Sequence, residues 1–323
     1  ASSRVVVPSN DPIHRPHLFL RKMENRQLGT TGFTVSSIGM GCVTFGREID
    51  EQTSFEVLDR AVDRGINLFD SAAAYAAGAS ESVLGRWMAD RGYRDRIVLA
   101  TKVNGTLTRN HILRSAEDSL KRLRTDRIDL FQLHHWVEDA PLDEALGALN
   151  DLVAAGKVRS IGCSNWRAWQ LAKALIHAAH DGGQAIQSIQ PPYNLAQRDI
   201  EADLLPLCAD RNIGVISYSP LAAGFLSGKY RRGQDIPKGS RFDVIPEHQP
   251  IYFTDHGYEV LEKLETLAHE TGRSMIQLAL AWALTRTNVT SVLIGARNVA
   301  QVDQAFDALE MSLPDGAFER FGT

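Results

Sequence analysis

The 323-residue sequence has few cysteines, little net charge and no long apolar run. Cys42, Cys163 and Cys208 are odd in number and have no paired spacing, which argues against a disulfide framework or a zinc site and favours a reducing, cytoplasmic setting. A formal net charge of −4 gives no reason to expect nucleic acid or an anionic membrane as a partner. Since no uncharged apolar run reaches about 18 residues, no membrane span is expected.

The first 22 residues differ from the rest because they show no apolar periodicity. They contain Pro8, Pro12 and Pro16, and they lack the apolar core of about 7–15 residues that a secretory signal needs. Met23 begins the first patterned segment. We therefore predict that residues 1–22 are a disordered, processed or vector-derived extension and that 23–323 form a single domain.

Six polar residues recur at nearly one interval, each at or just after the end of a short apolar run. They are Asp70, Lys102, His134, Ser164, Gln190 and Tyr218, at successive steps of 32, 32, 30, 26 and 28 residues. About 30 residues is the length of one β-strand, one helix and two loops. Polar residues at the ends of successive strands are typical of the active site of a β/α barrel.

Eight strand-plus-helix units can be counted, which is the number that closes a (β/α)8 barrel of the TIM type. Strands are expected near 36–41, 66–69, 97–101, 128–133, 158–162, 186–190, 213–217 and 289–295, after an N-terminal hairpin at 26–40. A long insertion follows the seventh strand, since Gly295 lies 77 residues after Tyr218. An open dinucleotide-binding sheet is disfavoured because Gly39-Met40-Gly41 lacks the third glycine of G-x-G-x-x-G.

Asp70, Tyr75, Lys102 and His134 form a chemically coherent set at three neighbouring strand ends. An ammonium beside a tyrosine lowers the pKa of the phenol, and a carboxylate keeps a buried lysine protonated. His134 can orient a carbonyl oxygen. The set suits a proton donor for a carbonyl becoming an alcohol, with the hydride coming from a cofactor.

The sequence also resembles the aldo-keto reductases across residues 24–310. The segments that carry the resemblance are NLFDSAAAYAAGASESVLG (67–85), TK (101–102), IDLFQLH (128–134), IGCSN (161–165), SIQPPYNLAQR (188–198), SYSPLAAGFLSGKY (217–230) and VLIGARNVAQ (292–301). They are most similar to the branch that contains potassium-channel β subunits and related bacterial reductases. The resemblance implies a barrel that binds NADP(H) without a Rossmann domain. It also implies that Tyr75 is the general acid/base, tuned by Lys102 and Asp70, and that His134 orients the carbonyl.

The same resemblance implies a set of cofactor-binding residues. Those expected around the nicotinamide are Gly41, Asp70, Ser164, Asn165, Gln190 and Tyr218. Those expected at the pyrophosphate are Ser219, Leu221 and Ala222, with Lys229 and Arg241 adding charge. Those expected at the adenosine 2′-phosphate are Gly295, Arg297 and Gln301. Arg297 favours NADPH over NADH because a guanidinium binds phosphate in a bidentate manner.

Two other functions remain open at this stage. One is a non-catalytic, cofactor-sensing module like a channel β subunit, and the other is a Schiff-base aldolase that uses Lys102. The sequence does not identify the carbonyl or alcohol substrate, and it does not indicate the oligomeric state. Loops at the barrel mouth, including Phe45, Trp136, Trp166 and 225–258, are the expected substrate contacts.

Overall fold

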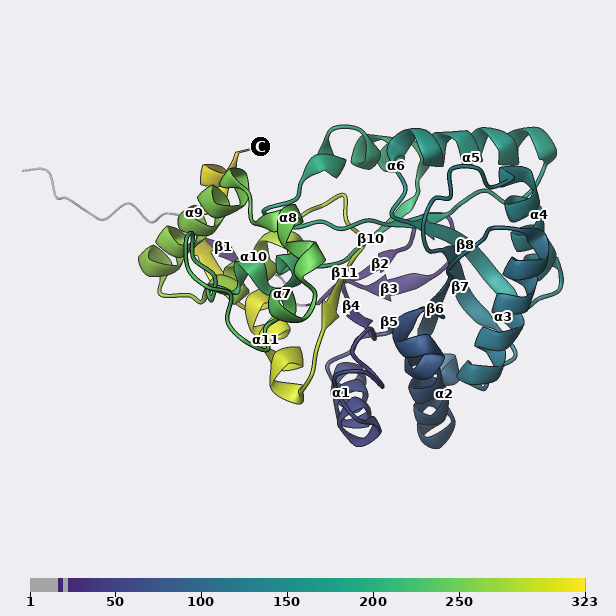
Figure 1. Cartoon of the computed structure of the whole chain (residues 1–323), viewed down its shortest axis with the longest axis horizontal. Helices are drawn as coiled ribbons and strands as arrows, with labels where there is room; N and C mark the ends of the chain where they lie inside the picture. Colours follow the sequence, from purple (N-terminus) through teal and green to yellow (C-terminus); the bar gives the residue numbers. More distant parts are fainter. Residues whose placement is uncertain (1–16, 20–22, 323) are drawn as a thin grey trace, which may run out of the picture.

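The computed structural model describes residues 17–19 and 23–322. Within them, eight parallel strands close into a barrel in the order β10-β11-β4-β5-β6-β7-β8-β9, which confirms the predicted fold (Figure 1). The barrel strands are β4 (Ile38–Gly41), β5 (Leu68–Asp70), β6 (Val98–Val103), β7 (Ile128–Leu133), β8 (Val158–Ser164), β9 (Ser188–Gln190), β10 (Gly214–Ser217) and β11 (Ser291–Gly295).

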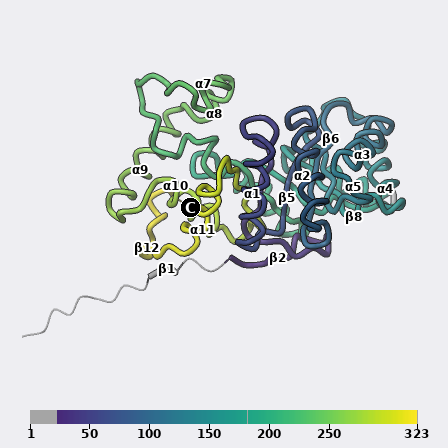
Figure 2. Tube along the Cα trace, turned by 90° about the horizontal axis from the view of Figure 1, so that it is seen from below, coloured from purple at the N-terminus to yellow at the C-terminus, as the bar shows by residue number. Residues whose placement is uncertain are grey.

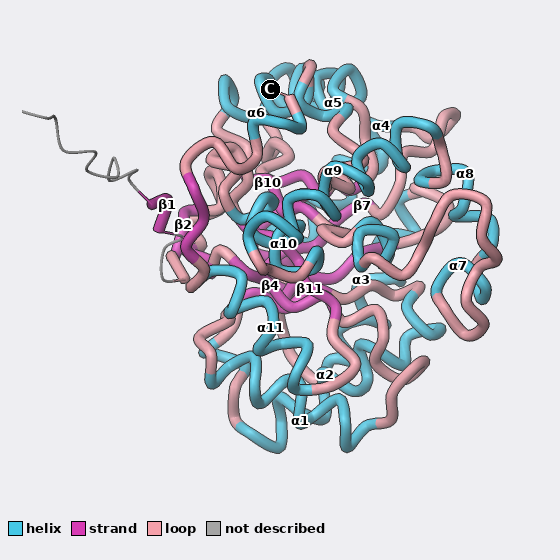
Figure 3. Tube along the Cα trace, turned by 90° about the vertical axis from the view of Figure 1, so that its left-hand side faces the viewer, coloured by secondary structure: helices cyan, strands magenta, loops and turns pink. Residues whose placement is uncertain are grey.

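Helices surround the ring of strands, as Figure 3 shows. Those that follow successive strands are α1 (Glu51–Asp63), α2 (Ala79–Arg91), α3 (Arg109–Leu123), α4 (Leu142–Ala154), α5 (Ala168–Asp181), α6 (Leu204–Arg211) and, after β11, α11 (Val299–Leu309). Asp50 caps α1 by accepting a hydrogen bond from the backbone N–H of Thr53 at 2.8 Å. Pro141 stands at the N-cap of α4 rather than inside its first turn, so that helix begins one residue later than expected.

A hairpin of β2 (Asn25–Gln27) and β3 (Thr34–Ser36) closes the amino-terminal end of the barrel. Its Leu28 and Val35 pack against residues inside the barrel, such as Leu68 and Leu130. Gly29 has φ +52, and a Cβ there would lie 2.4 Å from the backbone nitrogen of Gly214, so only glycine fits. Because the hairpin fills the amino-terminal end of the barrel, a site inside the barrel can open only at the carboxyl ends of the strands.

The predicted insertion lies between β10 and β11 and contains α7 (Arg241–Val244), α8 (Gln249–Tyr252), α9 (Asp255–Thr271) and α10 (Met275–Leu284). Figure 2 shows the part with α7 and α8 projecting beside the barrel, next to α9. Phe225, Tyr230, Phe242, Tyr252 and Phe253 pack ring against ring there, with centroids 4.9–6.2 Å apart. The predicted insertion therefore contains helices and an aromatic cluster of its own.

The predicted N-terminal extension falls mostly outside the described residues. Only β1 (His17–Phe19) of this segment is described, and it pairs antiparallel with β12 (Ser312–Pro314). The three cysteines are free and buried. No helix in the described ranges is both long enough and apolar enough to cross a membrane.

Candidate active site

The strand ends bring Asp70, Lys102 and His134 to one mouth. Asp70 is the last residue of β5, Lys102 is the fifth residue of β6, and His134 directly follows β7. These three strands are neighbours in the barrel. Parallel strands end on the same side, so the spacing in the sequence becomes proximity in space.

Lys102 is fully buried and uses all three of its donors. Its Nζ lies 2.5 Å from Asp70 Oδ2, 2.8 Å from the carbonyl oxygen of Ser71 and 3.4 Å from the hydroxyl of Tyr75. Burial alone lowers the pKa of this ammonium, but Asp70 and Tyr75 raise it more, so the pKa of Lys102 lies above its ordinary value. The geometry holds a charged ammonium against the tyrosine oxygen.

The second oxygen of Asp70 is also fully engaged. Gln190 Nε2 donates to Oδ1 at 2.8 Å, and Gln132 Nε2 donates to the same atom at 3.2 Å. Gln132 was not singled out from the sequence, although a glutamine inside the apolar strand IDLFQL was a signal. A buried carboxylate that accepts several hydrogen bonds is held in one orientation.

Tyr75 begins a short 3-10 helix, Tyr75–Gly78, in the loop after β5. Ala76 and Ala77 there have φ of 50° and 51°, a left-handed conformation that costs an alanine about 1–2 kcal/mol. Burial raises the pKa of Tyr75 above its ordinary value, while the charge and hydrogen bond of Lys102 pull it down. The expected lowering by Lys102 is present, but burial outweighs it, so the net shift of the Tyr75 pKa is upward.

His134 faces Tyr75 edge-on, with ring centroids 5.8 Å apart, and stacks on His135 at 4.5 Å. Its side chain is buried, and its Nδ1 has no hydrogen-bond partner among the described residues. Burial, followed by the charges of Lys102 and His135, lowers the pKa of His134 to about 3. The imidazole is therefore neutral near pH 7 and can orient an oxygen without acting as the acid.

Four residues expected to hold a nicotinamide form one connected group. Ser164 Oγ donates to the carbonyl oxygen of Gln190 at 2.8 Å, and Asn165 Nδ2 donates to Ser164 Oγ at 3.1 Å. The hydroxyl of Tyr218 donates to Asn165 Oδ1 at 2.7 Å. Asn165 has φ 59°, which delays the start of α5 to Ala168 and turns the amide toward the mouth residues His134 and Tyr218. Amide and hydroxyl groups suit a carboxamide, which both donates and accepts.

The loop after β10 carries the expected pyrophosphate residues. Ser219, Ala222 and Ala223 have φ of 56°, 51° and 55°, and Leu221 between them has φ −97°. A left-handed residue beside a right-handed one can aim backbone N–H groups to one side, as in anion-binding loops. Within this loop the N–H groups of Ala222 and Gly224 already donate to the carbonyl oxygens of Ser219 and Leu221, at 2.9 and 2.8 Å. Lys229 Nζ lies 3.6 Å from the position a Cβ would take on Gly224, so its charge borders this loop.

Arg241, which was expected to add charge at the pyrophosphate, is the first residue of α7. Its guanidinium contacts Glu48 Oε1 at 3.5 Å, which joins α7 to the loop after β4. Burial and the nearby Arg47 lower the pKa of Arg241. Glu48, which the sequence did not reveal, therefore places a carboxylate beside this guanidinium.

Gly295, Arg297 and Gln301 meet at the turn into α11. The Arg297 backbone N–H donates to Gln301 Oε1 at 2.8 Å, and Asn298 caps the helix. The Arg297 side chain is exposed and has no carboxylate partner among the described residues. A Cβ on Gly295 would meet nothing within 4 Å, and one on Gly41 only ordinary contacts, so packing of the chain itself does not require either glycine.

The residues fit a nicotinamide dinucleotide better than a metal. No cluster of three or more metal-ligating side chains occurs in the part of the chain that the structure describes. The donors instead comprise an amide–hydroxyl group, a loop of left-handed residues and an unpaired guanidinium, in that order along the strand ends.

Comparison with known proteins agrees with this geometry. The sequence model of the Aldo/keto reductase family matches residues 37–322. The chain belongs to this family. Its barrel is therefore that of an aldo/keto reductase, and the family assignment makes the protein an oxidoreductase.

Relatives of this aldo/keto reductase have names of two kinds. An uncharacterized oxidoreductase of Bacillus subtilis, YrpG, is 37% identical over 310 residues, covering 90% of this chain and 92% of its own. A probable voltage-gated potassium channel subunit beta of Arabidopsis thaliana is 33% identical over 305 residues, with the same coverage. An aldo-keto reductase of Schizosaccharomyces pombe, yakc, whose name includes NADP(+), is 33% identical over 297 residues, covering 87% and 86%.

Proposed function

We propose that the protein reduces an aldehyde or ketone to an alcohol, reversibly, with NADP(H) as the cofactor. The observation that carries this proposal is the buried line from Asp70 through Lys102 to the hydroxyl of Tyr75, with His134 edge-on to the same ring. A bound NADPH would supply the hydride. Everything else in the reaction is proton transfer and orientation by this chain.

Tyr75 is the proton donor in this proposal. Its raised pKa keeps the phenol protonated at neutral pH, and the ammonium of Lys102 stabilises the phenolate as the proton leaves. His134 stays neutral and fixes the carbonyl oxygen near the phenol. Asp70, clamped by Gln132 and Gln190, holds the lysine in place.

Support for the cofactor comes from the residues along β8 to β11. Ser164, Asn165 and Gln190 are linked at one strand end and match the needs of a carboxamide. Arg297 is free of an acidic partner among the described residues, which suits a 2′-phosphate. The name of the yeast relative, which includes NADP(+), favours the same cofactor.

Two alternatives are weaker. A Schiff-base aldolase needs a neutral, nucleophilic lysine, whereas Lys102 is paired with Asp70 and its pKa is raised. A cofactor-sensing channel subunit is named among the relatives, but this chain has the complete proton-transfer set. NADPH consumption with a broad panel of aldehydes separates the reductase from the sensor.

The deciding experiment is Tyr75→Phe, which removes only the acidic hydroxyl. We expect kcat for aldehyde reduction to fall by about 100- to 10,000-fold, since that is the usual worth of a positioned general acid. NADPH binding, followed by fluorescence, stays close to wild type. Tyr93→Phe, at a half-buried tyrosine stacked under Arg96 and remote in sequence from the strand ends, is the matched control and keeps full turnover. Wild-type turnover in Tyr75→Phe would remove Tyr75 from the mechanism.

A further inference from the structure

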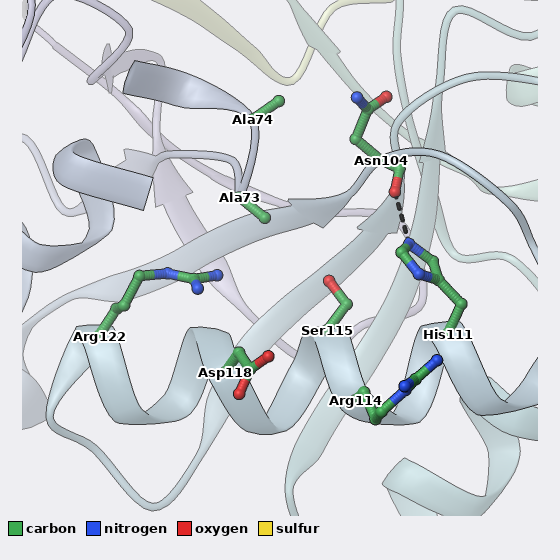
Figure 4. A pocket seen from close by; sticks show the side chains of 8 residues that line it. All are labelled: Ala73, Ala74, Asn104, His111, Arg114, Ser115, Asp118 and Arg122. Carbon is green, nitrogen blue, oxygen red and sulfur yellow. Dashed lines mark hydrogen bonds between the residues drawn. The ribbon is translucent and has the colours of Figure 1, made fainter. Parts of the chain in front are cut away.

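A cavity of about 530 Å³ lies behind the loop that carries Tyr75 (Figure 4). Its upper wall is formed by Ala73 and Ala74, which directly precede Tyr75, and by Asn104, two residues after Lys102. Its lower wall is α3. The cavity therefore borders both chain segments that supply the proton-transfer residues, and the proposed mechanism uses none of its side chains.

The polar groups that line this cavity include donors on Arg114, Ser115 and Arg122 and one carboxylate, Asp118. In Figure 4 the guanidinium of Arg122 points across it from one side, the hydroxyl of Ser115 points up from α3, and the ring of His111 closes the other side. His111 Nε2 lies 2.7 Å from the carbonyl oxygen of Asn104, which fixes the ring. Ser115 has no hydrogen-bond partner for its hydroxyl among the described residues, so this donor is available.

The charges around the cavity leave one cation unbalanced. Arg122 is neutralised by the buried Glu81, at 2.6 Å, and Asp118 is paired with Lys121 at 3.2 Å. Arg114 has no carboxylate partner among the described residues, and its Nε donates only to the carbonyl oxygen of Asn110 at 3.3 Å. The site thus combines a free guanidinium, a free hydroxyl and a histidine.

We propose that this cavity binds a carboxylate or phosphate group carried by the carbonyl substrate. Guanidinium groups recognise both anions by paired hydrogen bonds, and the hydroxyl of Ser115 adds a donor at a remaining oxygen. The volume is many times that of one water molecule, about 30 Å³, so it accommodates the anion together with part of its linker. The inference rests on the proposed function and extends it: the preferred carbonyl compound is anionic.

The first test uses two aldehydes that differ only in a distal charge, pentanal and 5-oxopentanoate, at saturating NADPH. Wild type should prefer the charged aldehyde in kcat/KM. Arg114→Gln should lose about tenfold on 5-oxopentanoate and nothing on pentanal, a modest effect because the guanidinium is exposed to solvent. Arg114→Lys should recover part of the loss.

Arg109→Gln is the control for a change in overall charge. It removes a cation from the same helix, but its side chain pairs with Asp151 and lies against α4, near Gly147, rather than in the cavity. It should leave the ratio between the two aldehydes unchanged. Equal rates on both aldehydes in wild type, or equal losses on both in Arg114→Gln, would overturn the substrate-borne anion.

The second test does not depend on turnover. Inorganic phosphate is titrated against the NADPH-loaded protein at constant ionic strength, and thermal unfolding is followed. A rise in Tm that Arg114→Gln abolishes and Arg109→Gln retains supports an anion site. If phosphate also changes the rate with pentanal, the anion is a free effector instead of part of the substrate. The absence of both a Tm shift and charge selectivity overturns the proposal, whereas failure to reduce any aldehyde overturns the reductase assignment alone.

Discussion

The two halves of the barrel mouth are built by different physical means. On the side of β5 to β7, Asp70, Lys102 and Gln132 form a buried network in which each charged atom is already bonded. On the side of β10 and β11, the shape comes from the backbone: Ser219, Ala222 and Ala223 are left-handed, and Arg297 is exposed and unpaired within the described chain. In the proposed mechanism, proton transfer requires fixed distances, whereas a cofactor brings its own charges. The first half accordingly has its buried charges paired without a ligand, and the second presents an exposed guanidinium.

The largest effect is expected for Lys102→Met, which disrupts the buried network beside β5 to β7. It leaves the carboxylate of Asp70 buried without its cation, which costs about 3–5 kcal/mol of unfolding free energy when a buried pair is broken. Aldehyde reduction should also be abolished. Urea unfolding measures the first effect and NADPH consumption the second.

The matched variant is Asp70→Asn combined with Lys102→Met. It removes both charges, so most of the lost stability should return while activity stays absent. If Lys102→Met alone is as stable as wild type, the buried pair does not hold this half together.

The second test uses His134 and the direction of its pKa shift. Because the pKa falls from 6.5 in the unfolded chain to about 3 in the folded one, only the unfolded chain binds this proton between those values. Stability is therefore fully present above about pH 6.5 and falls as the pH drops, by as much as about 1.4 kcal/mol per pH unit for this one group.

The measurement is the unfolding free energy of wild type and of His134→Gln from pH 7 to pH 4. The difference between the two should shrink toward low pH and reverse in favour of the variant. His256→Gln, on the exposed side of α9, serves as the control. Parallel curves for wild type and His134→Gln would mean that the imidazole is not kept neutral.

Beside β11, Arg297→Gln tests how much the exposed guanidinium contributes to the affinity for NADPH. We expect the Kd for NADPH to rise about tenfold and the Kd for NADH to stay the same, since only NADPH presents a phosphate to this guanidinium. Fluorescence titration measures both constants. Arg320→Gln, whose side chain pairs with Glu270, should change neither. Equal losses for both cofactors would argue against a 2′-phosphate at this turn.

The smallest effect is expected at Ala223→Gly. Glycine removes the left-handed strain of φ 55° but makes the unfolded chain more flexible, so the net gain in unfolding free energy is below about 1 kcal/mol. Ala89→Gly, on an exposed turn of α2, should instead lose about 1 kcal/mol. A loss at Ala223 as large as at Ala89 would show that the loop is not strained.

The sequence predicted most reliably the features that depend on polar residues at strand ends. The spacing from Asp70 to Tyr218 predicted the barrel, and β7 occupies the expected residues 128–133. The proximity of Asp70, Lys102 and His134 was predictable because these residues end or follow successive strands. Gln132 was missed because it lies inside β7, where most of the other residues are apolar.

Other features depend on the folded chain alone. Alanine gives no signal for a left-handed conformation, so the backbone at Ala76, Ala77 and Ala223 could not be predicted. The contact of Glu48 with Arg241 joins a loop to a helix nearly two hundred residues further along the chain, which no local sequence pattern reveals. The net pKa of Tyr75 depends on how deeply its loop is buried, which no spacing reveals.

The three hydrogen bonds of the Lys102 ammonium also limit which groups can exchange a proton with it. Two of them end on Asp70 and on the backbone of Ser71, both inside the protein, and the third reaches the hydroxyl of Tyr75 at the mouth. The hairpin with Leu28 and Val35 fills the opposite end of the barrel. The buried lysine therefore contacts the mouth only through Tyr75, so in the proposed mechanism a proton lost to the substrate is replaced through that hydroxyl.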